Sequence, residues 1–316
     1  MRSLSCPRCG APVFFDDLTC VSCDLSLAYD PGTDVVVDLA HGSGCRQRQT
    51  SEACGWLAPA TGSSCRSCRL DLVPADDERS PAGLRLAFQR ARRRALRQLL
   101  ARDLDPDAGR PPLRFALERS APGAPVTIGH ADGVVTLDLA EADPATREET
   151  RVSLGEPYRT PLGHVRHEVG HWVWAVTVDA KAPLAEFRAR FGDEREPYGE
   201  ALERHYAHPD DGSWRGTHLS HYAAAHPWED FAESFAHLLH VDDTLETAVS
   251  HGLVASPDSG FDQRYGTWLD LSVALNELNR SMGTPDAYPF SPPPPAVDKI
   301  RFCDGLLPLR GAVGAR

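Results

Sequence analysis

The chain of 316 residues contains no apolar run that approaches the roughly 20 residues needed to span a membrane. Its first residues, Met1 to Cys6, also lack the apolar segment of an export signal. From these two absences we expect a cytoplasmic protein that does not act at a membrane. Positive charge is in deficit too, because 33 basic residues stand against 45 acidic ones, for a net charge of −12. This balance argues against nucleic acid as a partner of the whole molecule.

Cysteine is nearly missing after residue 68, where only Cys303 remains, and we expect this isolated thiol to pack rather than react. The concentration of the other eight cysteines marks a separate N-terminal module. In a reducing compartment clustered cysteines bind metal more often than they form disulfides, so we expect two structural zinc sites of four thiolates each. Order along the chain assigns Cys6, Cys9, Cys20 and Cys23 to one site and Cys45, Cys54, Cys65 and Cys68 to the other. An interleaved arrangement stays open.

The cysteine module spans residues 1–73, where eight acidic residues outnumber six arginines, and this balance is wrong for gripping phosphate. Two roles remain open for the module. Its zinc ions either replace a hydrophobic core too small to fold alone, or support a surface for a protein partner or for substrate recognition. Residues 74–82 have the composition of a linker, so we expect a second domain at 83–316.

Residues 84–102 predict a helix with one apolar face, and they include seven arginines and no acidic residue. We expect a solvated face whose arginines pair with acids of this acidic protein. The alternative is contact with an acidic partner or nucleic acid. Residues 125–130 and 134–139 flank Ala-Asp-Gly, which predicts a β-hairpin. Toward the C-terminus, residues 268–278 predict a core helix and residues 296–306 a final helix.

The stretch His167-Glu168-Val169-Gly170-His171 lies inside an apolar run. On a helix, His167 and His171 stand one turn apart on the same face and can hold one zinc ion. Glu168 then lies beside a metal-bound water and can take its proton as a general base. Gly170 leaves room for another backbone or a substrate to approach closely. The pattern therefore predicts metal-assisted amide hydrolysis.

A catalytic zinc ion held by two histidines needs a third protein ligand. We expect it from a helix around residues 228–236, where Glu229 and Glu233 lie one turn apart on one face. We assign Glu229 to the metal and Glu233 to a hydrogen bond with a ligand histidine, although the residues alone allow the reverse. Just before this helix, either Tyr222 or His226 could donate a hydrogen bond to the oxyanion of a reacting carbonyl.

These motifs resemble those of the gluzincin metallopeptidases, in which an HExxH helix is followed by a glutamate helix. The run from Tyr222 to Glu233 is similar to the catalytic end of anthrax lethal factor, and this resemblance implies that Tyr222 assists catalysis. The whole chain resembles a bacterial family of zinc-binding metallopeptidases with an N-terminal zinc ribbon. Its three signature stretches are similar to residues 166–171, 226–233 and 275–283.

We therefore expect an α+β protein, with a mostly helical zincin-like metallopeptidase domain that contains a small β-sheet and follows a zinc-ribbon module. Its function would be that of a zinc-dependent peptidase acting on proteins or peptides, with one catalytic zinc ion besides the two structural ones. The competing hypothesis is an adaptor that binds through its cysteine module and holds a structural zinc ion at His167 and His171. Glu168 separates the two, because a structural site has no use for a carboxylate beside an open coordination position.

Overall fold

The computed structural model describes residues 2–50, 53–72, 82–121, 123–179, 183–208, 210–257, 260–307 and 309. The linker predicted at residues 74–82 lies outside this part of the chain except for its last residue. The domain limits therefore stay a prediction. Among the described residues, no helix combines the length and the apolar character needed to cross a membrane.

The cysteine module is built from three antiparallel pairs of short strands. The pairs are β1 (Leu4–Ser5) with β2 (Pro12–Val13), β3 (Leu27–Asp30) with β4 (Val35–Asp38), and β5 (Ser43–Gly44) with β6 (Leu57–Ala58). Strands this short bury little surface, so the packing depends on a few large rings. The ring of Tyr29 packs against Phe15 at 4.6 Å and against Trp56 at 5.3 Å between centroids, and all three residues are buried. Such a small core is typical of modules that metal sites stabilise.

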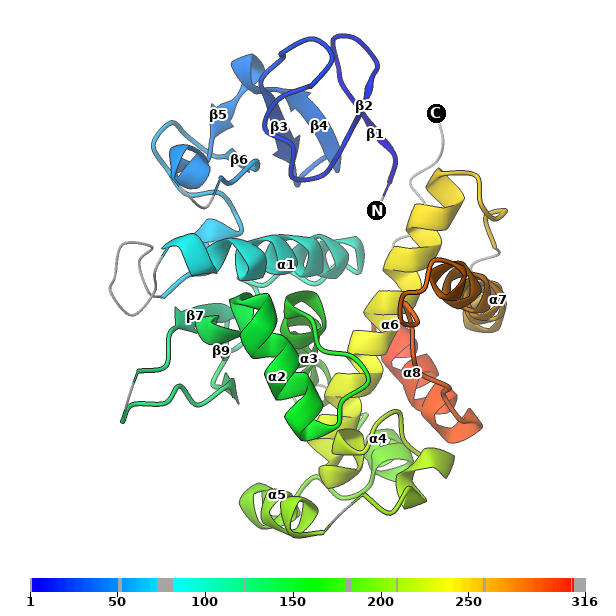
Figure 1. The fold of residues 1–316 in the computed structure, drawn as a ribbon. Coiled ribbons are helices and arrows are strands. Elements are labelled where there is room, and N and C mark those ends of the chain that lie inside the picture. The colour runs from blue at the N-terminus through cyan, green and yellow to red at the C-terminus, as the bar shows by residue number, and fades with distance from the viewer. Residues whose placement is uncertain are drawn as a thin grey trace.

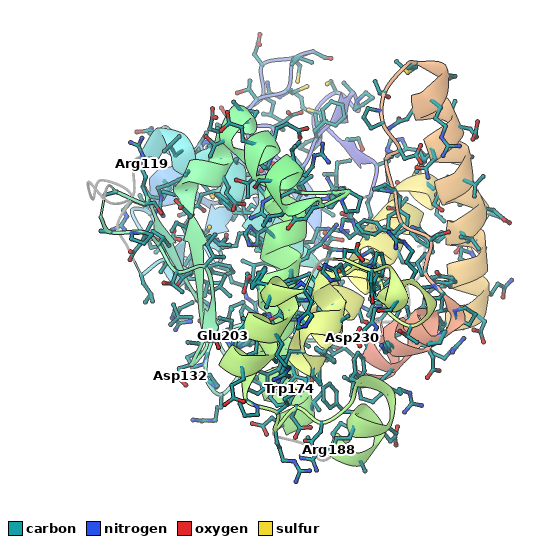
Figure 2. The ribbon with its side chains drawn as sticks, turned by 60° about the horizontal axis from the view of Figure 1, so that its bottom comes forward. Arg119, Asp132, Trp174, Arg188, Glu203 and Asp230 are labelled. Atoms are coloured by element: carbon teal, nitrogen blue, oxygen red, sulfur yellow. The ribbon has the colours of Figure 1, made fainter. Side chains whose placement is uncertain are left out.

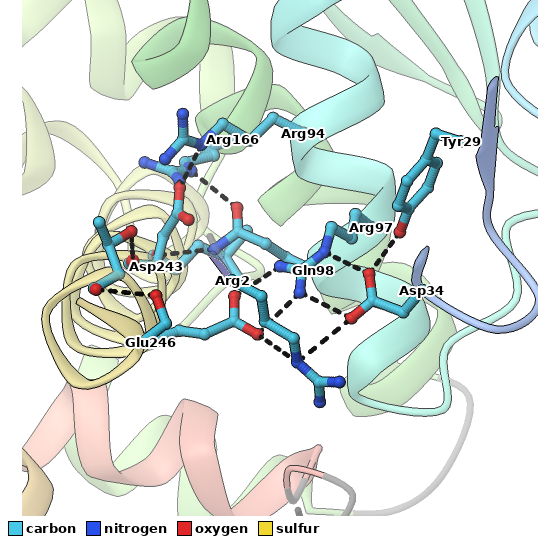
Figure 3. A network of polar contacts seen from close by, with 12 residues as sticks. Arg2, Tyr29, Asp34, Arg94, Arg97, Gln98, Arg166, Asp243 and Glu246 are labelled. Carbon is cyan, nitrogen blue, oxygen red and sulfur yellow. Dashed lines mark hydrogen bonds and ion pairs between the residues drawn. The ribbon is translucent and has the colours of Figure 1, made fainter. Parts of the chain in front are cut away.

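Helix α1 (Ala82–Ala101) lies between the cysteine module and the helices of the second domain (Figure 1). Arg97 joins the two sides (Figure 3). Its guanidinium contacts Asp34 of the module at 2.7 Å and Glu246 of the second domain at 2.5 Å. The hydroxyl of Tyr29 donates to the same Asp34 at 2.5 Å. The arginine-rich helix is therefore an internal connection between the two parts of the chain.

The prediction that the arginines of residues 84–102 form a solvated face is wrong in one respect. The arginines pair with acidic residues of the protein, as predicted, but five of those in residues 84–102 are buried: Arg85, Arg92, Arg93, Arg97 and Arg102. A guanidinium can be buried when carboxylates satisfy its planar set of donors, and the cysteine module and the second domain supply those carboxylates. Burial removes these five side chains from contact with nucleic acid or an acidic partner.

Asp71 tests the strength of this internal interface. It follows the last cysteine of the module, has a side chain 9% exposed, and pairs with Arg92 and, at 3.0 Å, with Arg85. We expect Asp71→Ala to lower the free energy of unfolding of the zinc-loaded full chain by about 3–5 kcal/mol, because a buried guanidinium loses its carboxylate. Urea unfolding followed by tryptophan fluorescence measures the change. The matched control is Glu203→Ala on an exposed side chain, for which we expect a change within about 0.5 kcal/mol. Equal stability of both variants would contradict the prediction.

After α1, the chain forms a three-stranded sheet of order β7-β9-β8. Its strands are β7 (Arg114–Glu118), β8 (Gly129–Ala131) and β9 (Val134–Asp138), with β7 parallel and β8 antiparallel to β9. Asp132 and Gly133 between β8 and β9 have φ values of 48° and 83°, which suit a two-residue type I′ turn. The predicted hairpin is confirmed, but its first strand is shorter than residues 125–130. The N–H of Val126 donates instead to the Ser120 hydroxyl at 2.9 Å.

Helices make up most of the second domain and surround α6 (Figure 1). They are α2 (Pro144–Leu154), α3 (Pro161–Trp174), α4 (Leu184–Phe191), α5 (Tyr198–Ala207), α6 (Pro227–Ser250), α7 (Phe261–Ser281) and α8 (Pro294–Leu306). Helices α3 and α6 each begin with a capping side chain followed by proline. The Thr160 hydroxyl accepts from the Gly163 N–H at 3.0 Å, and His226 Nδ1 accepts from the Trp228 N–H at 3.1 Å. The predicted α+β class, with a mostly helical second domain, is confirmed.

The two C-terminal helices were both predicted, but α7 is less buried than expected for a core helix. Trp268 and Leu271 are buried, whereas three other apolar residues of α7 are exposed: Leu269, Val273 and Leu278. The helix packs along one side only, so the remaining apolar positions face outward. In α8, Cys303 is fully buried, in agreement with the packing role expected for this thiol.

Candidate metal centre

The centre lies where α3 crosses α6. A Cβ atom on Gly170 would lie only 2.9 Å from the Cα of Ala232 and 3.1 Å from its carbonyl oxygen, so glycine permits this close approach of the two backbones. Each helix presents two polar side chains, three residues before and one residue after the crossing: His167 and His171 on α3, and Glu229 and Glu233 on α6. The crossing therefore brings two histidines against two glutamates that lie about 60 residues away along the chain.

His167, His171 and Glu229 converge on one point. Glu229 Oε2 lies 2.9 Å from His167 Nε2 and 3.5 Å from His171 Nε2, and one ligand atom from each residue lies within 4.8 Å of the others. Ligands about 2.0–2.1 Å from a tetrahedral zinc ion lie about 3.3 Å apart, so these donors have a suitable spacing. The chemistry also fits, because two imidazole nitrogens and one carboxylate oxygen leave a fourth position open.

The remaining atoms of these side chains have partners of their own. The Tyr198 hydroxyl donates to Glu229 Oε1 at 2.7 Å, which leaves Oε2 for the two histidines. Glu233 Oε1 lies 3.4 Å from His167 Nδ1, on the far side of the ring from Nε2. The other oxygen of Glu233 lies 3.6 Å from His237 Nε2. Glu229 thus lies beside the converging nitrogens, and Glu233 lies behind one of the rings.

Glu168 has one free carboxylate oxygen. The side chain is buried, and among the described residues its Oε2 has no hydrogen-bond partner. Its Oε1 lies 3.7 Å from His164 Nε2, while His164 Nδ1 lies 3.1 Å from Glu141 Oε2. Burial alone would raise the pKa of Glu141, but His164 and Arg159 outweigh it and lower this pKa to about 2. An ionised Glu141 thus orients His164, and His164 faces one oxygen of Glu168.

The two candidate oxyanion donors differ in position. The ring of Tyr222 lies 6.0 Å from that of His167 between centroids, and burial raises the pKa of Tyr222 above its ordinary range, so the hydroxyl keeps its proton. His226 is a different case. Its Nδ1 caps α6 and its Nε2 lies 3.1 Å from the Glu196 carbonyl oxygen, so both ring nitrogens are engaged in local structure. The alternative that His226 donates to an oxyanion is therefore wrong.

A cleft of about 1700 Å³ opens beside these residues. It is lined by the β8–β9 hairpin, by α5 and by the cleft-facing sides of α3 and α6. In Figure 2, Asp132 at the hairpin turn and Glu203 on α5 lie to the left of Trp174, the last residue of α3. His167, Glu168, His171, Tyr222 and Glu229 all line the cleft.

Several residues around the centre carried no recognisable signal in the sequence. They come from separate segments, namely the turn after β9, the start of α5, and the segment before α8: Glu141, Tyr198 and Tyr288. Tyr288 contacts His237 Nδ1 through its hydroxyl at 2.5 Å. His164 and His237 also have no pattern that separates them from the other histidines of the chain. Periodicity cannot find such residues, because each acts from a different element.

The eight N-terminal cysteines form two groups, and within each group the four sulfur atoms lie within 4.8 Å of one another. The groups are Cys6, Cys9, Cys20 and Cys23, and Cys45, Cys54, Cys65 and Cys68. They follow the order along the chain, and the interleaved arrangement does not occur. Four thiolates at this spacing suit a tetrahedral zinc ion.

Comparison with known proteins agrees with this geometry. The sequence model of a family described as "Putative zinc-binding metallo-peptidase" matches residues 86–306. The chain belongs to this family. The model of a zinc-ribbon domain matches residues 3–78 of this chain, as expected from its cysteines. Two relatives, "Uncharacterized protein Mb2598c" of Mycobacterium bovis and "Uncharacterized protein Rv2568c" of Mycobacterium tuberculosis, are each 39% identical over 327 residues, which cover 96% of this chain and 94% of the relative. No solved structure matches it.

Proposed function

We propose that this protein is a zinc-dependent peptidase. The observation that carries the proposal is that Glu168 lines the same cleft as the three converging ligands and keeps a buried Oε2 atom that has no hydrogen-bond partner in the described part of the chain. A buried carboxylate oxygen without a hydrogen-bond partner lowers the stability of the folded protein, so its presence calls for a functional reason. A role as the general base that accepts the proton of a water molecule is such a reason.

In this proposal His167, His171 and Glu229 hold zinc, which when bound polarises the substrate carbonyl and lowers the pKa of a water molecule. Glu168 takes a proton from that water through Oε2 and delivers it to the leaving amine. Tyr222 donates its hydroxyl hydrogen to the carbonyl oxygen as negative charge develops there. The cleft, of about 1700 Å³, offers room for a peptide in an extended form.

Four other side chains position these groups. Tyr198 holds one oxygen of Glu229, and Glu233 holds the Nδ1–H of His167 and thereby selects the tautomer that offers Nε2 to the metal. Glu141 orients His164, whose Nε2 lies 3.7 Å from Oε1 of Glu168. The two cysteine sites are structural in this proposal. The adaptor hypothesis has no observation in its favour, because a purely structural site would not need Glu168 in an open cleft.

Zinc analysis joined to an unbiased peptide-library digestion tests the proposal. The zinc-saturated full chain is expected to hold three zinc ions and to cleave library peptides. The double variant His167→Ala/His171→Ala is expected to hold two and to cleave none above background, because only the cysteine sites remain. His251→Ala, on an exposed histidine outside the cleft, serves as the control with three ions. Two zinc ions in the parent protein, or cleavage by the double variant, would overturn the proposal.

A further inference from the structure

Aromatic rings line one end of the cleft. They come from the loop before α3, from α6, and from the segment before α8: Tyr158, His237, His240 and Phe290. The Phe290 ring lies 4.6 Å from that of His237 and 6.1 Å from that of Tyr158, and Tyr158 lies 5.5 Å from His240. Tyr158 and Phe290 are half-buried, so part of each ring faces the open cleft.

This aromatic pocket adjoins the metal centre along α6. Glu229, Glu233, Ala236 and His240 all line the cleft at successive turns of one helical face. The seven steps along the helix from Glu229 to Ala236 span about 10 Å at 1.5 Å per residue. An extended peptide rises about 3.3 Å per residue, so a long side chain within two residues of the scissile bond can reach the pocket. Ala236 contributes only a methyl group, which leaves the space between the rings unfilled by α6.

The His240 ring carries no charge. Arg166 can only donate, so its contact with His240 Nδ1 at 2.9 Å makes that nitrogen an acceptor and His240 a neutral ring. Burial, followed by the nearby Arg166 charge, holds the pKa of His240 well below its ordinary value. His237 uses Nδ1 with Tyr288 and faces Glu233 with Nε2. The nitrogens of the two rings are therefore engaged with the protein. His237 itself is buried, so the partly exposed ring surface of the pocket comes from Tyr158, His240 and Phe290.

We propose that the aromatic pocket binds a large apolar side chain of the substrate, such as phenylalanine or leucine, within two residues of the scissile bond. The inference rests on the proposed peptidase function and adds its substrate class, namely peptides with a large apolar residue at that position. Such a side chain leaves water and packs against rings, whereas a lysine side chain would lose hydration against the aromatic rings.

Peptide binding to the zinc-loaded Glu168→Gln full chain tests the pocket without turnover. The probes are the blocked hexapeptide Ala-Ala-Ala-Phe-Ala-Ala and its analogues with alanine or lysine in place of phenylalanine, measured by calorimetry. We expect the phenylalanine peptide to bind about 10- to 100-fold more tightly than either analogue. Equal affinity for all three peptides would overturn the proposal.

Two further substitutions locate the effect. In the Glu168→Gln background, Phe290→Ala removes one wall and is expected to lower affinity for the phenylalanine peptide about 10-fold, with no change for the alanine peptide. Ala236→Leu fills the same space and should abolish the preference even if Phe290→Ala fails to fold. Phe14→Ala, on a ring 75% exposed in the cysteine module, is the control and should keep the preference. A preference that survives both pocket substitutions would refute this site.

The two proposals fail in different ways. If the parent enzyme cleaves a peptide library with no enrichment of large apolar residues within two positions of the cut, the pocket proposal is wrong and the peptidase proposal stands. If Glu168→Gln binds the phenylalanine peptide selectively while the parent cleaves nothing, the pocket proposal is supported and the peptidase proposal is wrong.

Discussion

Glu168→Gln is expected to keep its zinc and to slow peptide hydrolysis by about 100- to 10,000-fold. Glutamine preserves the shape of the side chain, but its amide cannot take a proton from water. The substitution falls on an atom without another structural task, since Oε2 is buried and lacks a hydrogen-bond partner in the described part of the chain. Measuring kcat and zinc content on one preparation separates loss of the base from loss of the metal.

Glu203→Gln is the matched control for this prediction, because it makes the same chemical change on an exposed side chain of α5. We expect the control to keep the parent rate within about twofold, since exposed substitutions change stability by only about 0.5 kcal/mol. If Glu168→Gln hydrolyses peptides as fast as the control, Glu168 is not the base. A loss of zinc by Glu168→Gln would instead place its carboxylate on the metal.

Glu229→Ala is expected to lose zinc from the centre on dialysis, and with it all activity. The carboxylate lies 2.9 Å from His167 Nε2 and 3.5 Å from His171 Nε2, so its removal leaves the metal with two protein ligands. Glu233→Ala is expected to keep the ion with affinity weakened by about 10- to 100-fold, because Glu233 acts through the Nδ1 of His167. Zinc titration with a competing chelator measures both affinities.

This pair of variants is its own control, because both remove a carboxylate from the same helix face one turn apart. The two residues differ in their contacts, because Glu229 lies near Nε2 of both His167 and His171, whereas Glu233 lies near Nδ1 of His167. Retention of zinc by Glu229→Ala together with loss by Glu233→Ala would reverse the assignment. It would also weaken the role proposed for Tyr222, which depends on the position of that residue relative to Glu229.

The cysteine module contributes carboxylates to the interior of the molecule. Asp16, Asp34 and Asp71 all pair with arginines of α1. Helix α1 in turn contacts α3, because Arg166 of α3, next to His167, donates a hydrogen bond to Oε1 of Gln98 on α1 at 3.0 Å. This continuity, part of which Figure 3 shows, favours a structural role of the module over a free docking surface. Zinc in the cysteine sites would then support the geometry of the cleft.

Helix α1 shows why the charge pattern of a segment does not predict whether its charged side chains are buried. Seven arginines without an acid in residues 84–102 indicate a solvated face when only local sequence is considered. Their carboxylate partners lie far along the chain, as in the contact of Arg97 with Glu246, 149 residues away. Burial of a guanidinium depends on partners that only the folded chain brings together. The exposed apolar residues of α7 are the converse case, because helical periodicity does not say how many sides of a helix are covered.

Features that depend on only a few neighbouring residues could be predicted from the sequence. The spacing of four residues places His167 and His171 on one helical face, and the spacing of three brings most of the cysteines together in pairs. The φ preferences of Asp132-Gly133 favour the hairpin turn. The choice of the glutamate that lies beside both histidines required the folded chain, since Glu229 and Glu233 are equivalent on an isolated helix. The contact of Gly170 with Ala232 sets the register of the two helices, and that register places Glu229 at Nε2 and Glu233 at Nδ1 of His167.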